Sequence, residues 1–117
     1  MKYSIWEFNG EKHILVFSTR VLMRLEETGQ SWQDALKMHT ATIMIKAMAA
    51  MMDAGDRYAK REGIENAAPL SEDELLDMTS AYDMVSMDAA MAEAINAERK
   101  VIAVPPKNAE ATRPASK

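Results

Sequence analysis

The dipeptide Asn9-Gly10 constrains the fold of this chain more than any other feature of the sequence. It lies between two strand-like runs, residues 3–8 and 12–17, in which polar and apolar side chains tend to alternate. Asn-Gly favours a two-residue type I′ turn, because both central residues of that turn need a positive φ. The sequence therefore predicts a β-hairpin over residues 2–17.

A two-residue loop also fixes the register of the two strands. Trp6 is expected to face His13 across the hairpin, on a side of the sheet that also carries Leu15 and Phe17. Both sides are substantially apolar, and an isolated hairpin is only marginally stable in water. We expect one side to cover the helices. The other side, or a strand edge, then needs a second cover such as another subunit.

The residues after the hairpin are patterned as helices. Ser18, Ser31 and Ser71 each stand where an N-cap is expected, and Ser71 with Glu74 matches a capping box. A further helix is expected from about residue 39 to residues 62–63, with apolar residues nearly all round it over residues 41–52 and a polar pattern after Asp53. Such a helix is buried on several sides, either centrally in the fold or across an oligomer interface.

A further helical region runs from Ser71 to about Lys100, with Thr79-Ser80 as an expected break. Beyond residue 104 the composition becomes rich in Pro, Ala and polar residues, without apolar periodicity. We predict an α+β fold, mainly α. It comprises a single domain over residues 1–104, made of the hairpin 2–17 and a helical body 18–100 of about four to five helices, and a disordered tail over 105–117.

The sequence offers few groups for catalysis or metal binding. Cysteine is absent, and the two histidines, His13 and His39, do not have the spacing of metal ligands. No glycine-rich phosphate loop is present. The acidic run at residues 71–74 fits a capped helix start better than a cation site. We predict no enzymatic activity, no cofactor and no metal.

Charge and hydropathy indicate the compartment. The net charge is −4, with 18 acidic and 14 basic residues, which disfavours nucleic acid as a partner. No segment approaches the roughly 18 apolar residues that span a bilayer, and the N-terminus lacks the apolar core of a signal peptide. We expect a soluble cytoplasmic protein that does not bind a membrane.

Methionine is the compositional outlier, at 11 of 117 residues. Six methionines recur at helical spacing in two stripes, and methionine fills irregular cores as readily as it forms adaptable binding surfaces. The stripes therefore predict either buried core or a groove for a partner's helix, and both readings stay open. The six residues are Met44, Met48, Met51, Met84, Met87 and Met91.

Three short segments, residues 6–12, 16–20 and 25–31, carry a resemblance to a known family. Together they read Trp-Glu-Phe-Asn-Gly-Glu-Lys, Val-Phe-Ser-Thr-Arg and Leu-Glu-Glu-Thr-Gly-Gln-Ser. In this pattern the chain resembles the tail assembly chaperones of long-tailed, lambda-like bacteriophages. The resemblance covers residues 2–100 in layout and 5–31 in recognisable residues.

The resemblance implies that the protein binds the tape measure protein, keeps it soluble and promotes polymerisation of the tail tube around it. It implies a place in the host cell cytoplasm and absence from the mature virion. It also implies a longer product made by −1 ribosomal frameshifting, through which the tail tube protein is contacted. Codons for Pro105-Pro106-Lys107 can form a heptamer that permits such slippage.

We expect the partner to contact the second side of the hairpin and the methionine helices, and self-association to use either surface. Two alternatives remain open: a structural virion or head–tail joining component, and a small helical adaptor protein that binds a peptide or nucleic acid. The expected partner-binding residues are Trp6, Leu15, Phe17, Met44, Met48, Met51, Met84, Met87 and Met91.

Overall fold

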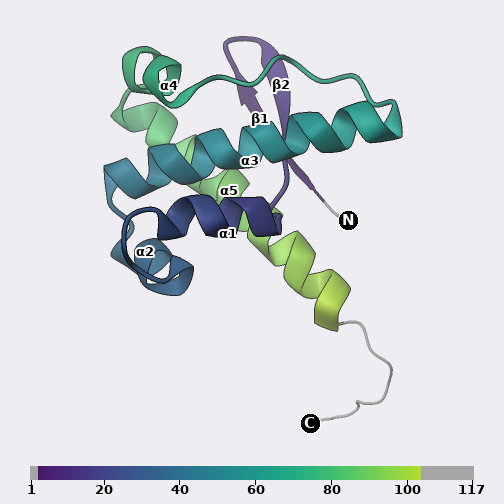
Figure 1. Ribbon diagram of the computed structural model, residues 1–117. Helices are drawn as coiled ribbons and strands as arrows, with labels where there is room; N and C mark the ends of the chain where they lie inside the picture. The colour runs from purple at the N-terminus through teal and green to yellow at the C-terminus, as the bar shows by residue number, and fades with distance from the viewer. Residues whose placement is uncertain (1–2, 104–117) are drawn as a thin grey trace, which may run out of the picture.

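The computed structural model describes residues 3–103, in which a two-stranded antiparallel hairpin precedes five helices (Figure 1). The predicted α+β, mainly α fold is confirmed. Lys2 and the tail predicted over residues 105–117 lie outside the described residues. The elements are β1 (Ser4–Phe8), β2 (Glu11–Leu15), α1 (Thr19–Glu26), α2 (Trp32–Met38), α3 (Ala41–Glu62), α4 (Glu72–Met78) and α5 (Ala81–Ala103).

The hairpin has the predicted turn and register. Asn9 and Gly10 have φ angles of 53° and 77°, as a type I′ turn requires. Trp6 pairs with His13, and Ser4 pairs with Leu15. The side of the sheet that carries these residues faces α5. On that side the Ser4 hydroxyl donates a 2.7 Å hydrogen bond to the Ala90 carbonyl of α5. The structure thus decides which side of the hairpin is turned inward.

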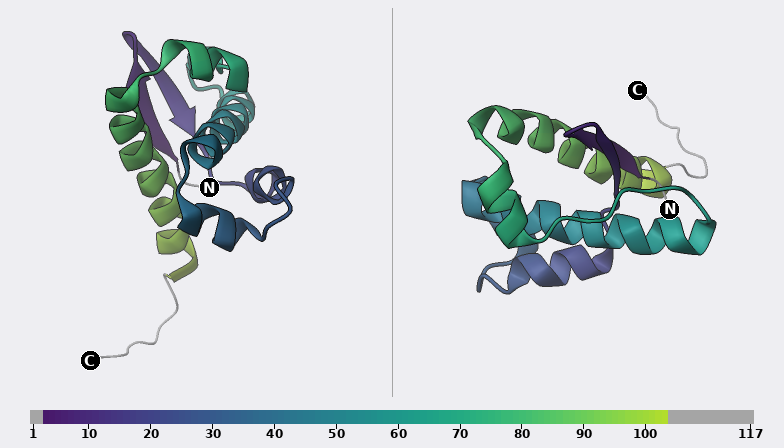
Figure 2. Two further views of the ribbon diagram at one scale, coloured as in Figure 1. Left: turned by 90° about the vertical axis from the view of Figure 1, so that its left-hand side faces the viewer. Right: turned by 90° about the horizontal axis from the view of Figure 1, so that it is seen from above.

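Helix α3 is the central element of the fold. It lies between α1 on one side and the hairpin with α5 on the other (Figure 2). Twelve of its 22 residues are buried, in agreement with an apolar pattern that runs nearly all round the helix. Of the two alternatives for this helix, a central position in the fold therefore accounts for its burial, without an oligomer interface.

A glycine allows α3 to approach the hairpin closely. A Cβ atom at Gly55 would lie 1.7 Å from the Ile14 carbonyl oxygen, so no larger residue fits there without a shift of the backbone. Nearby, the Val16 amide donates a 3.2 Å hydrogen bond to the Met51 carbonyl. The outer edge of β2 is covered by the segment after α3, where the Asn66 side chain accepts a hydrogen bond from the Ile14 amide at 2.7 Å.

The helix boundaries follow local capping chemistry, with one correction. Ser71 and Glu74 form the predicted capping box, and Ser31 caps α2 through the Asp34 amide. Ser18 precedes α1 as predicted, but its side chain makes no capping hydrogen bond. The predicted break at residues 79–80 is confirmed, since α4 ends at Met78 and α5 begins at Ala81.

Candidate partner-binding surface

The hairpin residues predicted to meet a partner belong largely to the core. Trp6 is 2% exposed and Leu15 is fully buried. The Trp6 indole N–H donates a 3.0 Å hydrogen bond to the Ser86 hydroxyl of α5, and its ring stacks on Phe8. Phe17 is half-buried beside α2. A partner reaches neither Trp6 nor Leu15 while the hairpin lies on α5.

The two methionine stripes meet where α3 and α5 contact each other. Met48, Met51 and Met87 are completely buried, and Met44 and Met91 are nearly so. Met84 is half-buried. The core interpretation accounts for most of these positions, while the rim of the α3–α5 contact keeps some methionine surface open.

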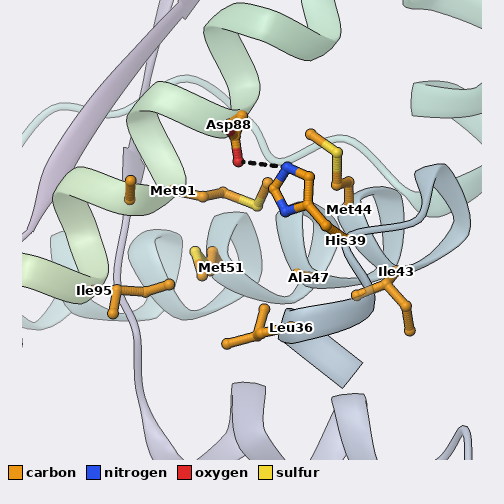
Figure 3. Close-up of a pocket in the computed structure, with 10 residues that line it drawn as sticks. Leu36, His39, Ile43, Met44, Ala47, Met51, Asp88, Met91 and Ile95 are labelled. Atoms are coloured by element: carbon orange, nitrogen blue, oxygen red, sulfur yellow. Dashed lines mark ion pairs between the residues drawn. The ribbon is translucent and has the colours of Figure 1, made fainter. Parts of the chain in front are cut away.

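That rim forms an apolar groove between α2, α3 and α5, with a cavity of about 140 Å³. Met44 and Met51 reach it from α3, and Met91 reaches it from α5, so three of the predicted residues come together here (Figure 3). We call this site the methionine groove. Its remaining lining residues are Leu36, His39, Ile43, Ala47, Asp88, Ala92 and Ile95.

An ion pair stands at the methionine groove. The His39 Nε2 and an Asp88 carboxylate oxygen are 3.1 Å apart, and the two side chains point toward one another from opposite elements (Figure 3). His39 directly follows α2 in the left-handed conformation, with a φ of 53°, and its ring points toward Asp88 of α5. The sequence did not indicate this pairing, because residues 39 and 88 are far apart along the chain.

The sequence did not predict the exposed apolar side of α5. Tyr82 is 89% exposed and Val85 is 71% exposed. Ala89 and Ala92 are exposed as well and follow at helical spacing, so the four residues share one side of the helix. We call these four residues the outer face of α5. The sequence did contain a signal for this face, because all four apolar residues lie on the side of the helix away from the buried stripe of Met84, Met87 and Met91.

The buried histidine of the hairpin has an unusual environment. His13 is 1% exposed, and neither ring nitrogen has a hydrogen-bond partner within the described part of the chain. Burial lowers the pKa of His13 more than the Glu11 carboxylate, 4.0 Å from Nε2, raises it. The ring is therefore held neutral in the core, beside Trp6, where no external ligand reaches it.

Neither a metal site nor a membrane-spanning helix is found among the described residues. No group of three His, Asp or Glu side chains in that part of the chain is arranged to hold a metal ion. None of the helices in residues 3–103 is long and apolar enough to cross a membrane.

No protein-family model, no curated protein and no solved structure matches the chain.

Proposed function

We propose that this protein is a tail assembly chaperone of a long-tailed bacteriophage. In this proposal it binds the tape measure protein, keeps that long helical chain soluble and promotes polymerisation of the tail tube around it. The observation that carries the proposal is the outer face of α5, where large and small apolar side chains face solvent along about three turns of helix. Such a face suits another helix as its cover.

The segment that carries the resemblance builds the scaffold. Residues 5–31 supply most of the hairpin and all of α1. Within them Trp6 and Leu25 are buried, and Gly29 has a φ of 90° that favours glycine. The residues that carry the resemblance therefore have roles in folding. Such roles support an architecture in common with the tail assembly chaperones. The surface for a partner lies beyond them, on the later helices.

The methionine groove supplies a second contact in this proposal. It lies beside the outer face of α5, since Ala92 belongs to both. Methionine side chains are flexible and polarisable, so one groove accommodates different apolar side chains. That property suits reversible binding to many similar segments along one helical partner.

The proposal includes a longer form of the protein. Frameshifting at Pro105-Pro106-Lys107, which lie outside the described residues, would append a segment that contacts the tail tube protein. The chaperone would act in the host cell cytoplasm and leave before the virion is complete.

Co-expression with the long helical protein encoded beside it tests the proposal. We expect co-purification of the two proteins and a larger soluble fraction of the long protein than when it is expressed alone. Purified virions should lack the chaperone. Failure to bind, together with stoichiometric presence in purified particles, would favour a structural or head–tail joining role instead.

A further inference from the structure

Charge is distributed unevenly along the sequence. Residues 62–98 hold ten carboxylates and no Lys, Arg or His, whereas residues 1–61 hold nine Lys or Arg and seven carboxylates. Helix α4 and most of α5 lie in the acidic stretch. The outer face of α5 therefore belongs to the acidic stretch of the chain.

The bases of the fold neutralise little of this charge. Arg24 of α1 and Lys46 of α3 both meet Glu72, at the start of α4. Asp73 and Asp77 are exposed and form no ion pair with another described residue. The acidic stretch therefore keeps a surplus of exposed carboxylates for an external partner.

Two carboxylates flank the outer face of α5. At 100° per residue, Asp88 projects on one side of the helix beside Ala92, and Glu93 projects on the other side beside Ala89. Glu93 is exposed and has no ion pair among the described residues, while Asp88 is held by His39. An apolar stripe with charged flanks is the pattern by which paired helices select partners of opposite charge.

We propose that the outer face of α5 binds an amphipathic helix whose apolar stripe is flanked by Lys and Arg residues. This inference rests on the proposed function, because it names the chemistry of the helical segment that the chaperone takes. Tyr82 and Val85 supply the apolar area. Ala89 and Ala92 are small, so a partner helix can approach this end of the face closely.

The charge pattern argues against other occupants. A second copy of this chain would present the same acidic flanks, and like charges facing each other across an interface are unfavourable. The same carboxylates disfavour anionic lipid and nucleic acid as occupants of this face. The chain's own residues 104–117 contain three prolines and no Leu, Ile, Met or aromatic residue, so they lack an apolar helical stripe.

Two synthetic helical peptides test the proposal directly. They have about 20 residues, matching the length of α5, and the same Leu stripe, with Lys on the flanks of one and Glu on the flanks of the other. Binding to the full chain is measured by fluorescence anisotropy at several salt concentrations. We expect the Lys peptide to bind at least about tenfold more tightly at low salt, with a ratio that shrinks as salt is added. Equal affinities at low salt would overturn the proposal.

Variants place the binding on the outer face. Val85→Ser should weaken binding of the Lys peptide by about tenfold or more, because it removes apolar contact area. Glu93→Lys should weaken binding of the Lys peptide by about two- to fivefold and strengthen binding of the Glu peptide, as for the loss or gain of one surface ion pair. Met23→Ser is the matched control, since Met23 is 64% exposed on α1. Equal losses for Val85→Ser and Met23→Ser would contradict the assignment.

Two further measurements separate this inference from the proposed function. If the co-expressed long helical protein still co-purifies with Val85→Ser, the chaperone function stands and the assigned face is wrong. If the wild-type protein fails to bind that protein but prefers the Lys peptide, the face is right and the function is wrong. A wild-type dimer in analytical ultracentrifugation that Val85→Ser dissociates would assign the face to a second copy and overturn the proposal.

Discussion

Helices α3 and α5 have nearly the same length and similar composition but different surroundings. They span 22 and 23 residues, and each contains ten alanine or methionine residues. Among the elements of residues 3–103, α3 packs against the hairpin and the other four helices, whereas α5 packs mainly against the hairpin and α3. The apolar side chains of α3 are explained by folding, and those on the outer face of α5 are not. Composition alone does not separate a helix that is covered on several sides from one that keeps an exposed apolar face.

The two helices should differ in what their side chains contribute, which is stability for α3 and binding for the outer face of α5. Substitutions around α3 and on the inner side of the hairpin should lower the free energy of unfolding. Substitutions on the outer face of α5 should leave that free energy nearly unchanged and alter binding instead. Four predictions test this division, starting with the largest expected effect.

The largest difference in the free energy of unfolding is expected between substitutions of Trp6 in the core and Tyr82 on the outer face of α5. Trp6→Ala should lower the free energy of unfolding by about 3–5 kcal/mol, because it removes a buried ring together with its hydrogen bond to the Ser86 hydroxyl. Leu25→Ala, also in the core, should cost about 2–5 kcal/mol. Tyr82→Ala should stay within about 0.5 kcal/mol of wild type. Urea unfolding measures all three, and similar losses for Trp6→Ala and Tyr82→Ala would erase the contrast.

Gly55 tests the close contact between α3 and the hairpin. Gly55→Ala should destabilise the protein by about 3 kcal/mol, because its Cβ would collide with the backbone of β2 rather than with a flexible side chain. Gly63→Ala is the control, since Gly63 has a φ of 69° but open space around its Cα. We expect only about 1 kcal/mol there, from backbone strain. A milder effect at Gly55 than at Gly63, measured by thermal unfolding, would show that the close approach is absent.

His13 should make stability depend on pH. Burial lowers the pKa of His13 in the folded state below the ordinary value of 6.5, so the unfolded chain binds the proton more readily. As the pH falls below about 6.5, stability should fall by at most about 1.4 kcal/mol per pH unit until the folded-state pKa is reached. His13→Phe should remove this contribution. Unfolding of both proteins between about pH 7.5 and about pH 5.5 checks it, and parallel pH profiles would mean that His13 is not buried neutral.

The smallest effect is expected at the methionine groove. His39 and Asp88 are both exposed by about half, so Asp88→Asn should change the free energy of unfolding by no more than about 0.5 kcal/mol. A double-mutant cycle with His39→Gln measures the pair itself. A coupling energy above about 2 kcal/mol would make the pair a structural link between α2 and α5, rather than a solvated feature of the groove.

Local signals allowed much of the fold to be predicted. Asn9-Gly10 fixes the turn and the register, while Ser71 with Glu74 marks the start of α4. The inward side of the hairpin could not be predicted, because both sides are apolar and only contact with α5 decides between them. Gly55 was not recognised either, since its role depends on a backbone 41 positions earlier in the chain.

The candidate site was predicted only in part. Met44, Met51 and Met91 do line one groove, but Trp6 and Leu15 are core residues. The outer face of α5 was missed, because a count of apolar residues along a helix does not say which side has a neighbour. The acidic stretch over residues 62–98 is visible in the sequence. The net charge of −4 hides it, because the rest of the chain carries an excess of basic residues.

Amide hydrogen exchange with and without the co-purified long helical protein tests the central claim most directly. The account predicts strong protection of α3 in both states and new protection over residues 81–97 of α5 when the partner is bound. New protection confined to the hairpin, with α5 unchanged, would contradict it.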